Sequence, residues 1–248
     1  MPERNALSEY SNQCMGEGFA NRVIYRMRRG LRREAAHFKM SCMASRVKTA
    51  VPFFPLMLNI SAKKCVVVGA GTVAAGKIRG LLMYGAKIVV VSPQAAGEVQ
   101  ALARAGKIKL LRREFAPLDV KGALLVIAAT NSPTVNASVF RVCRAQRILC
   151  NSVDDPEHCD FFYPAVVRRG ALQIAISTNG NLPALAARLR EELEDQFGAE
   201  WAEWLEQVGT TRRRLLASKM PAEERCTRLL RLASADEFHQ FAEKRKAK

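Results

Sequence analysis

The sequence lacks the residue patterns on which disulfide frameworks, structural zinc sites and histidine-based catalysis depend. Its seven cysteines are an odd number and include no Cys-x-x-Cys pair, which argues against the first two and favours a reducing compartment. Histidine occurs three times in 248 residues, so no Ser–His–Asp arrangement can be assigned. No apolar run approaches the ~20 residues that a membrane-spanning helix needs. We therefore expect a cytoplasmic protein without a membrane partner.

Acidic residues are few relative to basic ones. The chain has 39 Lys and Arg against 23 Asp and Glu, which gives a formal net charge of +16. Residues 1–50 contribute +6, from ten basic and four acidic residues, and the rest of the chain contributes +10. Such a balance suits polyanionic partners, including a small ligand with many carboxylates, although a solvated surface is its commonest explanation. No nucleic-acid-binding module accompanies the charge, so we expect no nucleic-acid partner.

Residues 1–50 form a basic extension without a sustained apolar face. Three interpretations compete for it. The start codon could be chosen too far upstream, with the true start nearer Met43 or Met57; the segment could be a disordered basic tail; or it could be an organelle presequence. We favour the first two. Pro52 and Pro55 then mark the entry to the folded part.

Residues 63–77 carry the most specific signal. A β-branched run ends at Gly69, Gly71 follows, and a helical pattern begins at once. In the dinucleotide-binding fingerprint the first glycine permits a tight turn and the second lets a pyrophosphate approach the backbone. A small third residue, here Ala74, lets helix and strand pack closely. Because such turns can also be purely structural, the pattern predicts nucleotide binding at Gly69 and Gly71 without establishing it.

From Leu56 onward, short apolar runs alternate with helical patterns. This alternation predicts an α/β fold of the Rossmann type over residues 51–162, with a parallel sheet covered on both faces. The segment Ala-Ala-Thr-Asn lies at the carboxyl end of one strand, where ligands of such sheets bind, so Thr130 is a candidate cofactor contact. The expected strands are 64–68, 87–91, 108–111, 123–128 and 147–150, and the expected helices are 72–84, 94–105 and 133–146.

The second expected strand ends without an ionisable residue. Val91 is followed by Ser92, Pro93 and Gln94. The carboxylate that usually binds the adenosine ribose of NAD is therefore missing, and so is an arginine for the 2′-phosphate of NADP. Ser92 and its neighbours could contact the ribose, or the segment could be a plain strand-to-helix connection. This rule leaves the choice between NAD and NADP open.

After Asp160 the pattern changes to two strands followed by helices. We expect a small α+β unit over residues 163–195 that serves dimerisation or substrate binding. A helical carboxyl-terminal unit is expected over residues 196–248. The expected strands are 161–167 and 172–176, joined by a turn at 168–170, and the expected helices begin at Leu182 and cover 201–208, 221–232 and 235–245.

Four acidic residues and a histidine crowd the loop at 150–164, after the last expected sheet strand. A carboxylate there would lie beside the expected nicotinamide site, where it could accept or relay a proton or bind an incoming metal. The alternative is a structural loop in which Asp154 or Asp155 caps a turn. His158 is more simply a surface or packing residue than a base.

Several segments occur together in one order along residues 52–245. They are Pro55–Ile60, Val68–Ala74 with Lys77, Ala128–Asn131, Cys150–Pro156, Phe161–Pro164, Ile176–Gly180, Leu182–Ala186 and Leu189–Glu191. This combination resembles the bifunctional precorrin-2 dehydrogenase and sirohydrochlorin ferrochelatase family, which also forms the amino-terminal module of siroheme synthases. The glycine turn is common to many families, whereas its combination with Asn-x-Val-Asp-Asp and Ser-Thr-Asn-Gly is not.

The resemblance implies a homodimer with a Rossmann domain, a central dimerisation unit and a helical carboxyl-terminal unit. It implies that NAD oxidises precorrin-2 to sirohydrochlorin and that some members then insert ferrous iron, a substrate, to give siroheme. The family's key aspartate falls on Asp154, credited with acid–base work and with a role in metal insertion. Its NAD contacts fall on Thr72, Val73, Pro93 and Gln94.

The resemblance has limits that keep other interpretations open. The position of a regulatory phosphoserine in siroheme synthases falls on Thr178, so a phosphorylated serine is not implied. Asp154 alone does not establish chelatase activity, because some stand-alone relatives only dehydrogenate. No methyltransferase pattern follows in the chain, so we expect another protein to methylate the precursor. The alternative of a different class is a non-catalytic, NAD-sensing Rossmann module, for which Asp154→Ala would leave function unchanged.

Overall fold

The computed structural model describes residues 53–246, so the extension expected over residues 1–50 lies outside the described part. A five-stranded sheet is built from β1 (Lys64–Val68), β2 (Lys87–Val91), β3 (Lys109–Leu111), β4 (Leu125–Ala128) and β5 (Leu149–Ser152). Its order is β3-β2-β1-β4-β5, and every neighbouring pair is parallel. The strand order reverses between β1 and β4, where sheets of this kind bind ligands at their carboxyl edge. The prediction of a Rossmann-type fold is confirmed.

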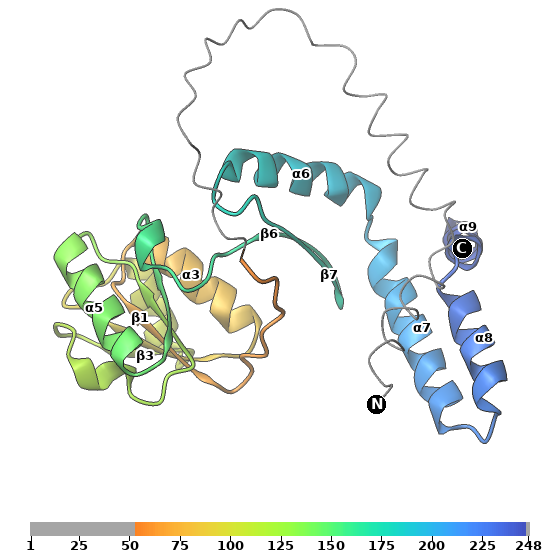
Figure 1. Ribbon diagram of the computed structural model, residues 1–248, viewed down its shortest axis with the longest axis horizontal. Coiled ribbons are helices and arrows are strands. Elements are labelled where there is room, and N and C mark those ends of the chain that lie inside the picture. The colour runs from red at the N-terminus through yellow and green to blue at the C-terminus, as the bar shows by residue number, and fades with distance from the viewer. Residues whose placement is uncertain (1–52, 247–248) are drawn as a thin grey trace, which may run out of the picture. The chain divides into compact units, whose positions relative to one another are not determined.

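Helices cover both faces of the sheet, as the sequence pattern predicted (Figure 1). One buried cluster joins β1 and β2 to α3 (Thr72–Met83) and α4 (Gly97–Arg104). A second cluster joins β1 and β4 to α5 (Pro133–Ala145) on the opposite face. Val66 and Val67 are neighbours on β1 and belong to different clusters, because successive side chains of a strand point to opposite faces. Both are fully buried, which explains why β1 reads as a continuous apolar run.

The start of β5 was predicted two residues too early. Arg147 adopts a left-handed backbone with φ 56°, and the Ile148 N–H donates to the Cys143 carbonyl at 2.9 Å. These residues therefore close the end of α5, and the strand begins only at Leu149. An apolar residue that completes a helix cap is hard to distinguish from the first residue of a strand.

The second sheet is an antiparallel hairpin of β6 (Ala165–Arg169) and β7 (Leu172–Ile176). The prediction placed β6 at residues 161–167, which is wrong by about two to four residues. The segment before β6 instead contacts β5: the Asp160 N–H donates to the Cys150 carbonyl at 2.7 Å, and the Phe161 carbonyl accepts from the side-chain amide of Asn151 at 2.9 Å. Residues predicted as a turn, including Arg168 and Arg169, lie in the strand.

The rest of the chain is helical, as expected. The helices are α6 (Pro183–Gln196), α7 (Glu200–Ala217), α8 (Ala222–Leu232) and α9 (Ala235–Lys246). The helix predicted over 201–208 continues to Ala217, because Gly209 does not interrupt it and the Thr210 hydroxyl bonds back to the Glu206 carbonyl at 3.0 Å. Whether α6 to α9 form separate domains with the predicted boundaries stays a prediction. None of the helices within residues 53–246 combines the length and hydropathy that crossing a bilayer requires.

Candidate active site

The turn after β1 requires glycine at its first position. Gly69 has φ 105°, a backbone conformation that side chains other than glycine rarely adopt. A Cβ at this position would lie 2.2 Å from the Ala129 carbonyl oxygen. The turn therefore packs directly against the end of β4. Its own N–H donates to the Val91 carbonyl at 2.9 Å, which ties the ends of β1 and β2 together.

The second glycine of the turn faces open space. A Cβ on Gly71 would meet no atom of the described chain within 4 Å, and Gly71 caps α3 without a side-chain hydrogen bond. The first N–H groups of α3 thus have no side-chain acceptor, and the helix dipole adds positive potential at the same point. An open cradle beside an uncapped helix fits the pyrophosphate of a dinucleotide. Ala74 is fully buried, as the close packing of helix and strand requires.

A cleft of about 650 Å³ opens in front of this turn. Of the predicted cofactor contacts, Gly69, Gly71, Pro93, Gln94 and Thr130 line it. Thr130 is held in place by its own side chain, which donates to the Asn136 amide oxygen at 2.7 Å. The other two predicted contacts, at positions 72 and 73, begin α3 directly after the cradle but do not line the cleft. Their contact with the cofactor stays a prediction.

Asp154 lines a second cavity, of about 530 Å³, rather than the cleft. It follows β5 and adopts a left-handed backbone with φ 62°. The turn is fixed on both sides, because the Val153 N–H donates to the Ala128 carbonyl at 2.9 Å and the Asp155 N–H donates to the Ser152 carbonyl at 3.3 Å. The backbone of Asp154 is thereby fixed, and the residue is exposed, at the same carboxyl edge of the sheet as the cleft.

Lys77, for which no role was predicted, lines this cavity together with Asp154. Lys77 is half-buried on α3, and its Nζ lies 4.0 Å from the centre of the Tyr163 ring. Burial lowers the pKa of Lys77, while the nearby Asp154 acts in the opposite direction, as would a thiolate at Cys159. The signal for this residue was its spacing: it follows buried Ala74 by three positions, which places a cation on the packed side of the helix.

The remaining polar residues of the loop hold its shape. The Asp155 carboxylate contacts His158 Nδ1 at 2.6 Å, and the His158 ring packs edge-on against Phe140 at 4.8 Å. The Cys159 thiol donates to the Ser152 and Asp155 carbonyls at 3.2 Å each, and burial raises its pKa. This supports the interpretation of His158 as a packing residue. Within residues 53–246, no group of three or more His, Cys, Asp or Glu side chains is arranged to hold a metal ion.

Comparison with family models gives two adjoining matches. A model described as "Putative NAD(P)-binding" matches residues 56–165, which contain the whole five-stranded sheet and the Asp154 loop. A model described as "Sirohaem biosynthesis protein central" matches residues 169–196, which contain β7 and α6. The five-stranded sheet and the glycine cradle therefore lie within the match to an NAD(P)-binding family model.

Two similar proteins are siroheme synthases. Siroheme synthase 3 of Aeromonas hydrophila is 37% identical over 188 residues, which are 76% of this chain and 40% of the relative. The siroheme synthase of Nitrosococcus oceani is 39% identical over 142 residues, which are 57% of this chain and 30% of the relative. This chain thus spans less than half the length of these relatives. Among solved structures, one described as "SirC, precorrin-2 dehydrogenase" matches with a TM-score of 0.64 and 24% identity. That match covers 79% of this chain and 100% of the other and shows a shared fold.

Proposed function

We propose, from the premise that this chain belongs to the sirohaem biosynthesis protein family, that it oxidises precorrin-2 to sirohydrochlorin with NAD. One observation carries the proposal. An open dinucleotide cradle at Gly71 and an exposed aspartate, Asp154, on a fixed backbone turn lie at the same carboxyl edge of the sheet. A reaction that removes a hydride and a proton together needs an acceptor for each.

The cradle supplies binding and orientation. The N–H groups at the start of α3 and the open space at Gly71 receive the pyrophosphate, and Thr130 bounds the cleft at the end of β4. When bound there, NAD accepts the hydride that precorrin-2 loses. The backbone turns that form the cleft are fixed by hydrogen bonds between strand ends, so the cofactor would meet a preformed site.

Asp154 accepts the proton in this proposal. Its carboxylate is exposed in the second cavity, so it can pass the proton to solvent after each turnover. The balance is complete, because the substrate loses one hydride to the cofactor and one proton to Asp154. Lys77 provides a cation in the same cavity. We assign it one task, which is pairing with a carboxylate of the tetrapyrrole.

Ferrous iron is proposed as a further substrate of the same cavity. Asp154 and Asp155 both line it, and carboxylates are suitable ligands for an incoming ferrous ion. A faster conversion of sirohydrochlorin to siroheme than in protein-free buffer would support this activity. Equal rates would contradict it and leave the dehydrogenase proposal intact.

We also propose a homodimer. The β6–β7 hairpin has no third strand within residues 53–246, and two-stranded sheets are marginal without further packing. Large apolar side chains near the start of the described chain are also exposed, among them Phe54 at 84% and Leu56 at 67%. Light scattering with size-exclusion chromatography should give twice the mass of one chain; a monomer at micromolar concentration would contradict this.

The deciding experiment supplies the full chain with enzymatically made precorrin-2 and NAD and follows NADH absorbance. We expect NADH and sirohydrochlorin to form in equal amounts. A folded sample that binds NADH but does not turn over would contradict the proposal and favour the NAD-sensing alternative. The Asp154→Ala variant separates the two, because a sensor would keep its function without the carboxylate.

A further inference from the structure

The lining of the nucleotide cleft is almost free of charge. Of the residues that line it, Glu114 is the one with an ionisable side chain, and no lysine or arginine is among them. This contrasts with the overall charge of the chain, which is +16. The absence of a cation from the lining is therefore not a consequence of composition. The uncharged lining matters for the choice between NAD and NADP, which the segment Ser92, Pro93 and Gln94 does not decide.

Glu114 lies on the side of the cleft where the adenosine ribose is expected. In this fold the ribose is bound at the end of β2, which here is Ser92. The Ser92 N–H donates to the Leu111 carbonyl at 3.1 Å, so the ends of β2 and β3 are joined. Glu114 follows β3 by three residues and lines the cleft together with Ser92. The lining therefore includes an acidic residue from the neighbouring strand end, although none follows β2 itself.

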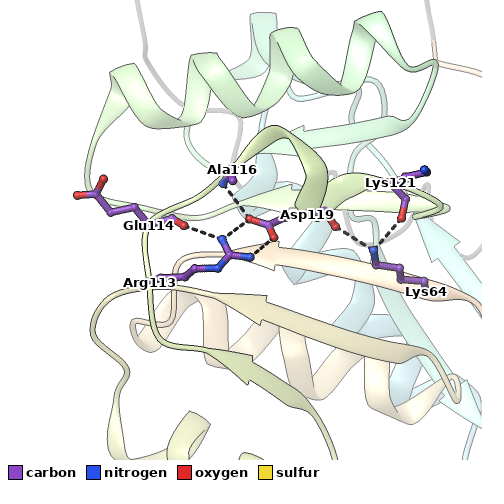
Figure 2. Close-up of polar contacts among 6 residues, drawn as sticks. All are labelled: Lys64, Arg113, Glu114, Ala116, Asp119 and Lys121. Carbon is purple, nitrogen blue, oxygen red and sulfur yellow. Dashed lines mark hydrogen bonds and ion pairs between the residues drawn. The ribbon is translucent and has the colours of Figure 1, made fainter.

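The arginine that precedes Glu114 is engaged elsewhere. Figure 2 shows the Arg113 guanidinium directed to the Asp119 carboxylate, with the Glu114 carboxylate pointing away from it. Arg113 Nη1 donates to Asp119 Oδ2 at 2.8 Å and to the Glu114 carbonyl at 2.9 Å, and Nη2 donates to Asp119 Oδ1. Asp119 is 8% exposed. Releasing Arg113 would leave this buried carboxylate without its charge partner, which is strongly unfavourable.

Asp119 is itself fixed from several sides. The Ala116 N–H donates to its carboxylate at 2.8 Å, and Lys64 Nζ donates to its backbone carbonyl at 2.9 Å (Figure 2). The hydrogen bond from Arg113 lowers the pKa of Asp119, so the carboxylate is ionised at neutral pH. The nearest basic side chain in sequence is therefore held by the protein and is not available to a ligand phosphate.

We propose that Glu114 selects NAD over NADP, and that the Arg113–Asp119 pair preserves this selection by withholding the adjacent arginine. The inference rests on the proposed function, since it concerns the same cleft. The 2′-phosphate of NADP is a phosphate monoester, which carries a charge of about −1.5 to −2 at pH 7. It would enter a cleft whose lining holds one carboxylate and no cation, whereas the ribose hydroxyl of NAD can donate a hydrogen bond to that carboxylate.

Direct titration of the full chain with NADH and NADPH, followed by nicotinamide fluorescence without substrate, tests the proposal. We expect NADH to bind about tenfold or more tightly than NADPH. Glu114→Gln should narrow this ratio, and Glu114→Lys should bring it to one or reverse it. Glu206→Lys makes the same change of net charge at an exposed position of α7 and should leave the ratio unaltered.

The outcomes separate this inference from the proposed function. If neither nucleotide binds to the folded wild-type chain, the proposed function fails. If both bind equally, or if Glu114→Lys changes the ratio no more than Glu206→Lys does, the selection by Glu114 is overturned while NAD(P) binding stands. Because Glu114 is exposed, its variants are expected to fold. Equal melting temperatures for the two lysine variants would confirm this.

Discussion

The two cavities at the carboxyl edge of the sheet differ in the groups that line them. The nucleotide cleft is shaped by backbone, through the turn at Gly69 and Gly71 and the joined strand ends, and its lining holds one ionisable residue. The cavity at Asp154 is shaped by side chains. It is lined by two carboxylates, Asp154 and Asp155, and by two cations, Lys77 and Arg190. A dinucleotide needs N–H groups and close approach, whereas a proton transfer and a polycarboxylate need charges. Under the proposed function, the cleft binds the cofactor and the second cavity receives the substrate and its proton.

The largest expected effect separates the cavities by activity. Asp154→Asn should lower kcat for precorrin-2 oxidation by about 10²–10⁴-fold, because it removes the proton acceptor. The dissociation constant for NADH should not change, since Asp154 does not line the nucleotide cleft. Steady-state NADH formation and fluorescence titration measure the two quantities. Asp195→Asn, at an exposed position of α6, is the control. If Asp154→Asn turned over at the wild-type rate, the cavity at Asp154 would not be distinguished from the cleft by a role in proton transfer.

The next prediction tests the backbone origin of the cleft with two matched variants. Gly69→Ala should lower the free energy of unfolding by about 3 kcal/mol or more, because its Cβ would overlap the Ala129 carbonyl at a positive φ. Gly71→Ala should leave stability nearly unchanged, since its Cβ meets no protein atom, but should weaken NADH binding by filling the cradle. Urea unfolding and NADH titration provide the readouts. Equal stability losses for the two variants would contradict this account.

A smaller effect is expected for the ion pair beside the cleft. Asp119→Ala should lower the free energy of unfolding by about 1–3 kcal/mol at pH 7, because Arg113 and the Ala116 N–H lose their acceptor. The pKa of Asp119 is lowered in the folded state. Its stabilising contribution is therefore present above the unfolded value of about 3.9 and is lost as the pH falls through the lower, folded value.

The difference between wild type and Asp119→Ala should accordingly stay constant from pH 7 to about 5 and shrink as the pH falls below about 4, over a series that extends to about pH 2. Urea unfolding at a series of pH values measures this difference. Asp236→Ala, at an exposed position of α9, should show no comparable trend. A difference that stays constant over this range would indicate that the ionised carboxylate is not what stabilises the loop.

The smallest expected effect concerns Lys77. Lys77→Met should raise KM for precorrin-2 about tenfold through the loss of a charge-assisted contact to a substrate carboxylate. NADH binding should stay the same, because Lys77 does not line the nucleotide cleft. Lys63→Met removes an equal charge from an exposed position and should leave KM unaltered. An unchanged KM in Lys77→Met would indicate that another basic residue binds the substrate carboxylate.

The strands and the nucleotide turn could be predicted because their signals are local. Val66 and Val67 belong to a β-branched run that is buried on both faces, and the requirement for Gly69 comes from a turn and one close contact. The roles of Lys77 and Arg113 could not be predicted in the same way. Each depends on what another element brings near it, Tyr163 for the first and Asp119 for the second.

The errors in the second sheet have the same origin. Residues 161–164 have the composition of a strand, but β5 takes up the hydrogen-bonding groups at Asp160 and Phe161, and Pro164 has no N–H to donate. The hairpin therefore begins later than its hydrophobic pattern indicates. Local propensity predicts that an extended segment exists, whereas the choice of its partner strand is a property of the folded chain.

The left-handed backbone at Asp154 favours some amino acids at that position over others. At φ 62° glycine, asparagine and aspartate are accepted readily, whereas β-branched residues are strained. Of the three accepted residues, one carries a charge. Variants with each of the twenty residues at position 154 could be selected first for folding and then for turnover. The number of accepted residues should fall at each of the two steps. The backbone at position 154 favours a few residue types, and the proposed proton transfer would require the one among them that carries a carboxylate.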